Sequence, residues 1–326
     1  MPPVVTIIIP VYNAAPFLAR SINSALTQVQ GKGTQEPAKV AGELILVDNN
    51  STDGSLEILN GYAAQFPEIV RVVQCKKQGA SAARNVGIAV AKGKWIQFLD
   101  ADDELLLGKI SGQLTNCQPD TSWVIAPYRQ QYPDGSTVDN FPHADPWKGL
   151  VYLYRIGNVC ANLYRRDTLQ IVGGFDETLP NNEDPDLHFR LLKSQTPFYL
   201  AERVHTIYHQ HDAPTRLSRS NLAGGQLRRA GLLVAINHYL RRHRPVYWTT
   251  NKHYFQGALL RALRMLATYL PVEAVSLYQQ EFVNQAEARR LLPLVPKHFQ
   301  YLHWALGFGP VERARTKLGR LRRWVT

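Results

Sequence analysis

The sequence has no long hydrophobic segment and no recognisable targeting signal. No apolar run reaches the roughly 18 residues that a membrane-spanning helix needs. The N-terminus, Met1-Pro2-Pro3, leads directly into a strand-like segment and lacks the basic region that begins a secretory signal peptide. We therefore expect a cytoplasmic protein.

Cysteine is scarce. Cys75, Cys117 and Cys160 are far apart in the chain, and their spacing matches no metal-binding pattern. An odd, scattered set of this kind is typical of reduced thiols in a cytosolic protein. The sequence therefore predicts neither a disulfide framework nor a cysteine-based metal site.

Common phosphate-binding motifs are also missing. There is no GxGxxG after the first strand-like segment and no GxxxxGK[ST] anywhere. Residues 10–20 lack the GxGxR-type loop expected of a sugar-1-phosphate nucleotidyltransferase. A phosphate would instead have to be held by a metal ion and by cationic side chains. Arg84 is a candidate, because arginine binds phosphate through two hydrogen bonds; the alternative is an ordinary surface residue of a helix.

Acidic residues are rare in the last third of the chain. Residues 216–326 contain 19 Lys and Arg but 4 Asp and Glu, a net charge of +15, whereas residues 1–215 have a net charge of −4. The asymmetry indicates an anionic partner for the C-terminal region. No nucleic-acid-binding module is recognisable, so we expect no nucleic-acid partner. We expect a first domain over residues 1–218 and a basic helical region over 219–326.

The first domain shows alternating strand and helix patterns. Short apolar or β-branched runs predict buried strands, and the segments between them have helical spacing or, at residues 30–42, the composition of a flexible loop. The expected strands are residues 4–10, 43–47, 69–73 and 95–99, and the expected helices are residues 16–29, 51–66 and 79–91. This alternation predicts an α/β fold with a mainly parallel sheet flanked by helices.

Polar residues follow three of these strands: Tyr12-Asn13, Asp48-Asn49-Asn50 and, after residue 99, Asp100-Ala101-Asp102-Asp103. In open α/β sheets the ligand crevice lies outside the carboxyl ends of the strands. Asp100 and Asp102 can therefore reach a single hard cation that also binds substrate phosphates. The alternative is that such residues only make turns, or that Asp102 or Asp103 caps a helix beginning at Glu104.

Taken together, several motifs resemble inverting nucleotide-sugar glycosyltransferases of family 2, which have a GT-A, Rossmann-like fold. The resemblance covers about residues 4–215, with nucleotide-sugar binding in about 1–103 and the acceptor side in about 104–218. The motifs are PVYN (10–13), VDNNSTDGS (47–55), GASAARNVGIAVAKGKWIQFLDADD (79–103), GGFDE (173–177) and NEDPDLHFRL (182–191).

The resemblance implies a donor site. Asp100-Ala101-Asp102 corresponds to the DxD motif, which holds Mn²⁺ or Mg²⁺ and the donor diphosphate. The segment Pro10-Val11-Tyr12 matches the lining of the nucleobase pocket. Asp48 and Asn49 match a pair of acidic residues, the second of which contacts the base. On family grounds we expect a UDP-sugar. Asn49 departs from that acidic pattern, and its amide oxygen also suits another base.

The resemblance also implies a catalytic base. Asp184 matches the residue that takes the proton from the acceptor hydroxyl. Glu183, on the acceptor side, and Asp186 are expected to raise the pKa of Asp184 by like-charge repulsion. Asp186 is expected to cap the helix that follows.

Further residues are assigned with alternatives. His211 matches a family histidine that reaches the metal or the diphosphate; the alternative is a structural histidine. Arg216 and Arg219 are expected in a mobile loop over the phosphates, or as plain surface charge. Residues 127–149 are expected to form a hairpin or loop that faces the acceptor, with Trp147 as an aromatic surface for sugar.

The basic region ends in a predicted amphipathic helix over residues 311–326. An apolar stripe is expected at Ala314, Leu318, Leu321 and Val325, with basic residues elsewhere on the helix. One interpretation is peripheral contact with the inner face of an anionic membrane. The other is a helix packed on the protein with a solvated basic face.

The function that the resemblance implies is inverting transfer of a sugar from a nucleoside-diphosphate donor to an acceptor hydroxyl. The acceptor would be a glycan or a lipid-linked molecule, in cell-envelope polysaccharide or glycolipid synthesis. The alternative is a non-catalytic sugar-nucleotide-binding or membrane-associated scaffold protein. The presence of Asp100, Asp102 and Asp184 disfavours that alternative.

Overall fold

The structure is a computed structural model that describes residues 3–29, 40–152, 154–211, 221–282 and 307–322. The chain divides into two compact units, Met1–Ala213 and Pro214–Thr326. The expected loop at residues 30–42 lies mostly outside the described residues.

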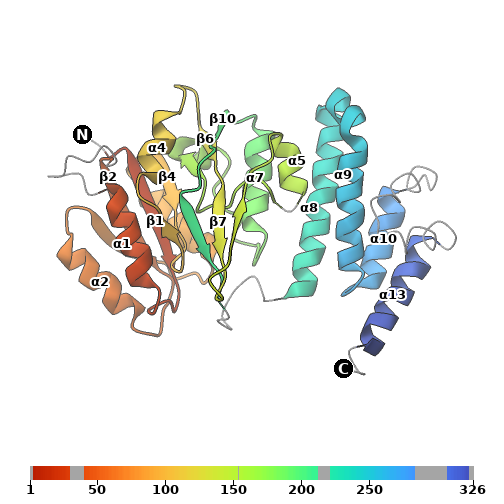
Figure 1. Cartoon of the computed structure of the whole chain (residues 1–326), viewed down its shortest axis with the longest axis horizontal. Helices are drawn as coiled ribbons and strands as arrows, with labels where there is room; N and C mark the ends of the chain where they lie inside the picture. Colours follow the sequence, from red (N-terminus) through yellow and green to blue (C-terminus); the bar gives the residue numbers. More distant parts are fainter. Residues whose placement is uncertain (1–2, 30–39, 153, 212–220, 283–306, 323–326) are drawn as a thin grey trace. The chain divides into compact units, whose positions relative to one another are not determined.

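The first unit is built on a seven-stranded sheet with the order β10-β6-β9-β4-β1-β2-β3 (Figure 1). Its strands, in chain order, are β1 Val5–Val11, β2 Gly42–Asp48, β3 Val70–Gln74, β4 Trp95–Phe98, β6 Trp123–Ile125, β9 Leu163–Arg165 and β10 Phe198–Leu200. β1 pairs in parallel with β2 and with β4, whereas β9 is antiparallel to both of its neighbours. The sheet is therefore mixed but mainly parallel, as predicted.

Helices cover both faces of this sheet. They are α1 Leu18–Val29, α2 Ser55–Gln65, α3 Ala80–Val90, α4 Lys109–Thr115, α5 Pro146–Val151, α6 Arg166–Ile171 and α7 Glu183–Lys193. Ile7 and Ile9 of β1 join Leu18 and Ile22 of α1 in one core cluster. Ile8, which points to the other face, lies so close to Gly87 of α3 that a Cβ there would be 2.4 Å from its side chain. The alternation along β1 thus places one helix on each face.

The first unit also contains a smaller sheet, with the strand order β5-β11-β7-β8. Its strands are β5 Glu104–Leu105, β7 Tyr128–Gln131, β8 Thr137–Asn140 and β11 Thr206–His209. β7 and β8 form the hairpin expected within residues 127–149. The helix expected from Glu104 is wrong: Glu104 and Leu105 pair with β11, and the next helix begins only at Lys109. Local acidic capping signals were outweighed by a long-range strand pairing.

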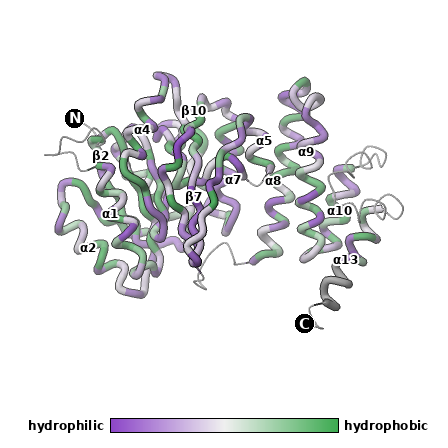
Figure 2. Tube along the Cα trace, in the orientation of Figure 1, coloured by the Kyte–Doolittle hydropathy of each residue, from purple (hydrophilic) through white to green (hydrophobic). Residues whose placement is uncertain are grey.

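The described part of the second unit is helical. It comprises α8 Leu222–His243, α9 Pro245–Leu266, α10 Pro271–Glu281 and α13 Phe308–Arg322. α8 and α9 pack side by side as a hairpin, and Pro245 occupies the first turn of α9, where a missing N–H is tolerated (Figure 1). Hydrophobic and hydrophilic residues alternate along both helices (Figure 2), and no described helix is long and apolar enough to cross a membrane.

The apolar stripe expected on the C-terminal helix is wrong at Ala314, and the side chains of Leu318, Leu321 and Val325 lie outside the described residues. Ala314 is exposed, whereas Phe308, Val311 and Glu312 are buried. Glu312 accepts hydrogen bonds from Arg264 of α9 (2.8 Å) and from Arg315. The described buried face of α13 therefore includes an ion-paired glutamate, which was not part of the expected apolar stripe.

Candidate active site

The three polar strand ends converge on one edge of the main sheet. β1, β2 and β4 are adjacent and parallel, with Val11 opposite Asp48 and Ile8 opposite Phe98. Their carboxyl ends therefore meet, as predicted from the alternation of strands and helices.

Loops after β1 and β2 are joined by hydrogen bonds. The Asn13 side-chain oxygen accepts from the backbone N–H of Thr52 (2.7 Å), and Ser51 accepts from the N–H of Asn13 (3.2 Å). Asp48 is buried and accepts from the N–H of Ser51 (3.3 Å). Tyr12 is 48% exposed. The predicted nucleobase segment thus has an exposed aromatic ring on a rigid support.

Asn49 is buried, and its amide bonds to backbone. Its nitrogen donates to the carbonyls of Cys75 (3.1 Å) and Lys77 (2.7 Å), and its oxygen accepts from the N–H of Gly79 (2.7 Å). Gly79 immediately precedes α3 and has φ +135°. Asn49 therefore positions the start of the helix that carries Arg84, a role that spacing alone did not indicate.

A tight turn, Asp100 to Asp103, follows β4. The N–H of Asp103 donates to the Asp100 carbonyl (3.1 Å), and Ala101 is buried in the core cluster. Arg20 and Ser21 of α1 donate to the carbonyls of Asp102 (2.5 Å) and Asp100 (3.0 Å). Neither Asp102 nor Asp103 caps a helix, which corrects that alternative.

Asp102 meets the predicted histidine. The His211 Nε2 and Asp102 Oδ2 atoms are 2.6 Å apart, and the His211 ring stacks on Phe17 at 4.7 Å between centroids. Residues 102 and 211 are brought together by the pairing of β5 with β11. The Arg216 and Arg219 predictions lie outside the described residues.

Arg84 lies among three carboxylates and is not a surface residue. It is 4% exposed, and its guanidinium donates to Asp100 (2.8 Å) and Glu183 (3.3 Å), with Asp184 Oδ1 at 3.9 Å. The ring of Phe175 lies 5.2 Å below it. The surface alternative for Arg84 is therefore wrong, because α3 turns this face toward the strand ends.

Asp184 has the electrostatics of a base that functions near neutral pH. Burial raises the pKa of Asp184 to about 7; Arg84 opposes this increase, and Glu183 and Asp100 add to it. Within the described residues, its buried Oδ1 atom accepts no hydrogen bond. Of the two acidic residues expected to raise this pKa by like-charge repulsion, Glu183 does contribute, but removal from water is the larger cause.

Asp186 does not cap α7, which is a further correction. Asn182, at φ +65°, precedes the helix, and Asp186 lies within its first turn. Asp186 instead pairs with Arg190 (2.8 Å), whose guanidinium also donates to the carbonyls of Val172 and Gly174 (2.6 Å each). The pair ties α7 to the GGFDE motif.

Asn85 joins the same motif to α3. It donates to the Phe175 carbonyl (2.9 Å) and accepts from the Phe175 N–H (2.8 Å), and it also donates to Glu177 (2.9 Å). Gly174, at φ +64°, packs so closely that a Cβ would lie 2.6 Å from the Asn85 side chain. Gly173 and Gly174 belong to the GGFDE motif, and Asn85 belongs to the motif at residues 79–103. These residues could have indicated the contact between Gly174 and Asn85.

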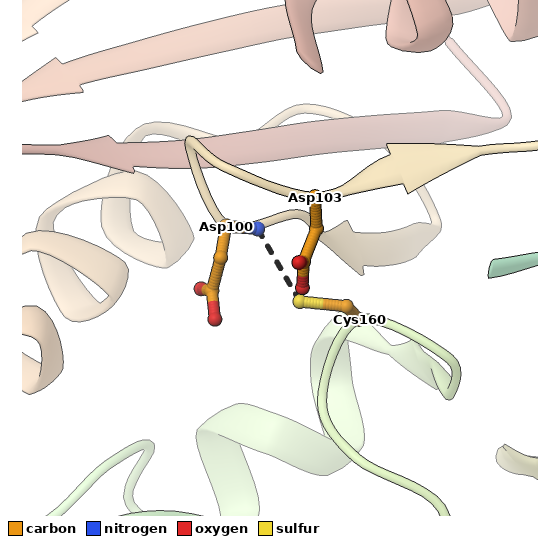
Figure 3. Close-up of side chains that lie close together, drawn as sticks. All are labelled: Asp100, Asp103 and Cys160. Carbon is orange, nitrogen blue, oxygen red and sulfur yellow. Dashed lines mark hydrogen bonds between the residues drawn. The ribbon is translucent and has the colours of Figure 1, made fainter. Parts of the chain in front are cut away.

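Sequence analysis missed the segment 158–162. The Cys160 thiol accepts from the Asp100 N–H (3.3 Å), as Figure 3 shows, and the neighbouring Val159 backbone hydrogen-bonds to Asp184. Gln97 of β4 donates to the Cys160 carbonyl (2.7 Å) and accepts from the fully buried Lys109. One segment therefore contacts both Asp184, the predicted catalytic base, and Asp100, a predicted donor-binding residue.

Carboxylates and imidazole near the turn suit a divalent cation such as Mn²⁺. Asp100 and Asp102 are partly exposed, and Asp102 already lies beside His211. The compact group of possible ligand atoms within the described residues is Asp100, Asp103 and Cys160, all within 4.8 Å (Figure 3). Burial raises the pKa of Cys160 well above its usual value, so the thiol stays protonated and is a poor ligand for a hard cation.

Trp147 does not present a ring to the acceptor. It is 5% exposed and packs edge-on against Phe189 at 6.2 Å, as a core contact between α5 and α7. Asp145, just before it, caps α5 and fixes the tryptophan on the inner side of the helix. Exposed aromatic rings in the same region are Tyr132 and Phe141.

Comparison with known proteins decides the family. The model of glycosyl transferase family 2 matches residues 6–167, which include the strand ends, Arg84 and the Asp100–Asp102 turn. The chain belongs to this family. The chain is 36% identical over 100 residues to a poly(ribitol-phosphate) beta-glucosyltransferase of Bacillus spizizenii, a match that covers 30% of this chain and 15% of that protein. Matches to the first curated relatives span 26% to 53% of their length.

Solved structures agree on the fold of this chain. The S. aureus TarS fragment 1–349, in complex with UDP-GlcNAc, has a TM-score of 0.60 at 16% identity, covering 96% of this chain and 91% of that one. The mannosyltransferase PcManGT from Pyrobaculum calidifontis, in complex with GDP-Man and Mn²⁺, has a TM-score of 0.51 at 16% identity, covering 97% and 87%. The fold is GT-A, as predicted.

Proposed function

We propose that this family 2 glycosyltransferase transfers a sugar with inversion from a nucleoside-diphosphate donor to an acceptor hydroxyl. The observation that carries the proposal is the position of Asp184. Its buried Oδ1 atom accepts no hydrogen bond within the described residues and lies 3.9 Å from the Arg84 guanidinium. The same guanidinium bonds to Asp100, the first residue of the DxD motif. A base and a donor-binding carboxylate thus share one small space.

In this mechanism Asp184 accepts the proton of the acceptor hydroxyl as its oxygen attacks the anomeric carbon. Direct displacement needs no covalent intermediate, so the anomeric configuration inverts. Arg84 orients Asp100 and offsets the charge of the carboxylates around it. Asp100, Asp102 and His211 would hold a divalent cation, which supplies charge neutralisation for the departing nucleoside diphosphate.

We propose a UDP-sugar as donor, with the base against the Pro10-Val11-Tyr12 segment and the Asp48–Asn49 loop, and cell-envelope synthesis as the role. TarS was solved with UDP-GlcNAc, and a sequence relative is a poly(ribitol-phosphate) beta-glucosyltransferase, which supports both choices. PcManGT was solved with GDP-Man, so a guanine donor belongs in any test panel. A glycan or lipid-linked acceptor at the cytoplasmic membrane face fits this role, with peripheral contact through the basic second unit.

The test is release of nucleoside diphosphate from a panel of UDP-, GDP- and dTDP-sugars, with Mn²⁺, with Mg²⁺ and with chelator. We expect release from one donor, stimulated by metal and abolished by Asp184→Asn. Metal-dependent binding of a donor without release from the wild type would favour the non-catalytic sugar-nucleotide-binding alternative.

A further inference from the structure

The helical hairpin α8–α9 contains no acidic residue. No Asp or Glu occurs between Asp212 and Glu273, whereas the hairpin itself contains seven Arg and one Lys. Surfaces of soluble domains ordinarily intersperse both signs of charge. A purely cationic hairpin of this length therefore needs a reason outside its own fold.

The cations are concentrated where α8 turns into α9. Residues 241–246, Arg-Arg-His-Arg-Pro-Val, are all exposed, and Val246 is 81% exposed. We call these six residues the basic turn. Cations in the last turn of α8 favour its helix dipole, which accounts for one or two of them. It accounts neither for the exposed valine nor for the missing acids.

Aromatic rings support the basic turn. The guanidinium of Arg241 lies 5.4 Å from the centre of the Trp248 ring, and that of Arg244 lies 5.0 Å from the Tyr247 ring. Trp248 is buried and stacks on Phe255, which anchors the start of α9 in the core. The turn thus combines exposed cations and an apolar tip on a rigid base.

We propose that the basic turn is a docking surface for the anionic head groups of a lipid bilayer, with Val246 entering the interface between them. Guanidinium groups bind phosphate, and an apolar residue beside them gains contact with the acyl region. The C-terminal helix is a poorer candidate in its described part. There Phe308 and Val311 are buried, and Arg315 is paired with Glu312.

The test is co-sedimentation of the full chain with vesicles of phosphatidylcholine alone and of phosphatidylcholine with phosphatidylglycerol. Each basic residue at an anionic surface contributes about fivefold in affinity. We expect Arg241→Glu/Arg242→Glu to weaken binding to anionic vesicles by at least about 30-fold. Arg242→Glu alone should weaken it by about fivefold or more, and Val246→Ser should weaken it measurably without changing the salt dependence.

The matched control is Lys92→Glu/Lys94→Glu, which makes the same change in net charge at exposed positions of the first unit. It should leave vesicle binding within about twofold. Circular dichroism and thermal unfolding check that each variant is folded. Equal losses for both double variants would overturn the proposal, as would tighter binding to duplex DNA than to anionic vesicles at the same salt concentration. Because binding is measured without a sugar donor, its failure is separate from any failure of the proposed transferase activity.

Discussion

Replacement of Asp184 by asparagine should make the protein more stable at alkaline pH while abolishing transfer. Burial raises the pKa of Asp184 from 3.8 to about 7 in the folded protein. Between these values the folded state holds a proton that the unfolded state releases. Stability from this group is therefore fully present below pH 3.8 and is lost as pH rises through about 7.

The size of the effect follows from that interval. At about 1.4 kcal/mol per pH unit, ionised Asp184 lowers the free energy of unfolding by at most about 4 kcal/mol. From pH 5 to pH 8 the wild type should lose about 2 to 3 kcal/mol relative to Asp184→Asn. Urea unfolding of both proteins across this range measures the difference.

Asp134→Asn is the control for this experiment. Asp134 is fully exposed, and hydrogen bonds from Ser136 lower the pKa of its carboxyl, so its contribution changes only below about pH 4. Its stability difference from the wild type should be constant from pH 5 to pH 8. If the Asp184→Asn difference were also constant, the raised pKa, and with it our account of the base, would be refuted.

The same titration should appear in catalysis. Only the ionised carboxylate accepts a proton, so turnover should rise with pH and reach half its plateau near pH 7. Asp184→Asn should reduce turnover by about 10² to 10⁴-fold, the usual contribution of a general base. Isothermal titration with nucleotide and Mn²⁺ should give an unchanged affinity. A similar loss of affinity would place Asp184 in donor binding instead.

Three further predictions concern His211, Arg84 and Lys109. His211→Ala should raise the Mn²⁺ concentration needed for half-maximal turnover by about 10-fold or more, because an imidazole ligand is lost; an unchanged metal titration contradicts the ligand role. Arg84→Lys should weaken nucleotide binding in calorimetry, since a single ammonium cannot contact Asp100 and Glu183 in the planar geometry seen here; full affinity would contradict it. Lys109→Met should raise the urea midpoint, because burial lowers the pKa of Lys109 well below its usual value and the amine is costly to bury. The same change should lower turnover, because it removes the hydrogen bond from Lys109 to Asn162 in segment 158–162. A lower midpoint would show that the buried amine stabilises the fold.

Periodicity predicted the strands β1 to β4 and the helices α1, α2 and α3 between them, but not the strands β6, β9 and β10 that complete the main sheet. Strand ends after β1, β2 and β4 could be placed on one edge because parallel pairing follows from alternating strands and helices. The motif resemblance then singled out Asp184 and His211, which lie far from Asp100 in the sequence. Their roles in donor, metal and acceptor binding stay predictions, to be tested as above.

The sequence by itself determined which side chains could act in catalysis or binding. It also determined the local pattern that places each of them at the end of a strand or the start of a helix. Tertiary structure alone decided which of them meet: that Arg84 is buried among three carboxylates, that Trp147 belongs to the core, and that Glu104 joins a strand. Burial and long-range pairing depend on elements distant in the chain. The pKa of a carboxylate or the partner of a strand therefore cannot be obtained from neighbouring residues alone.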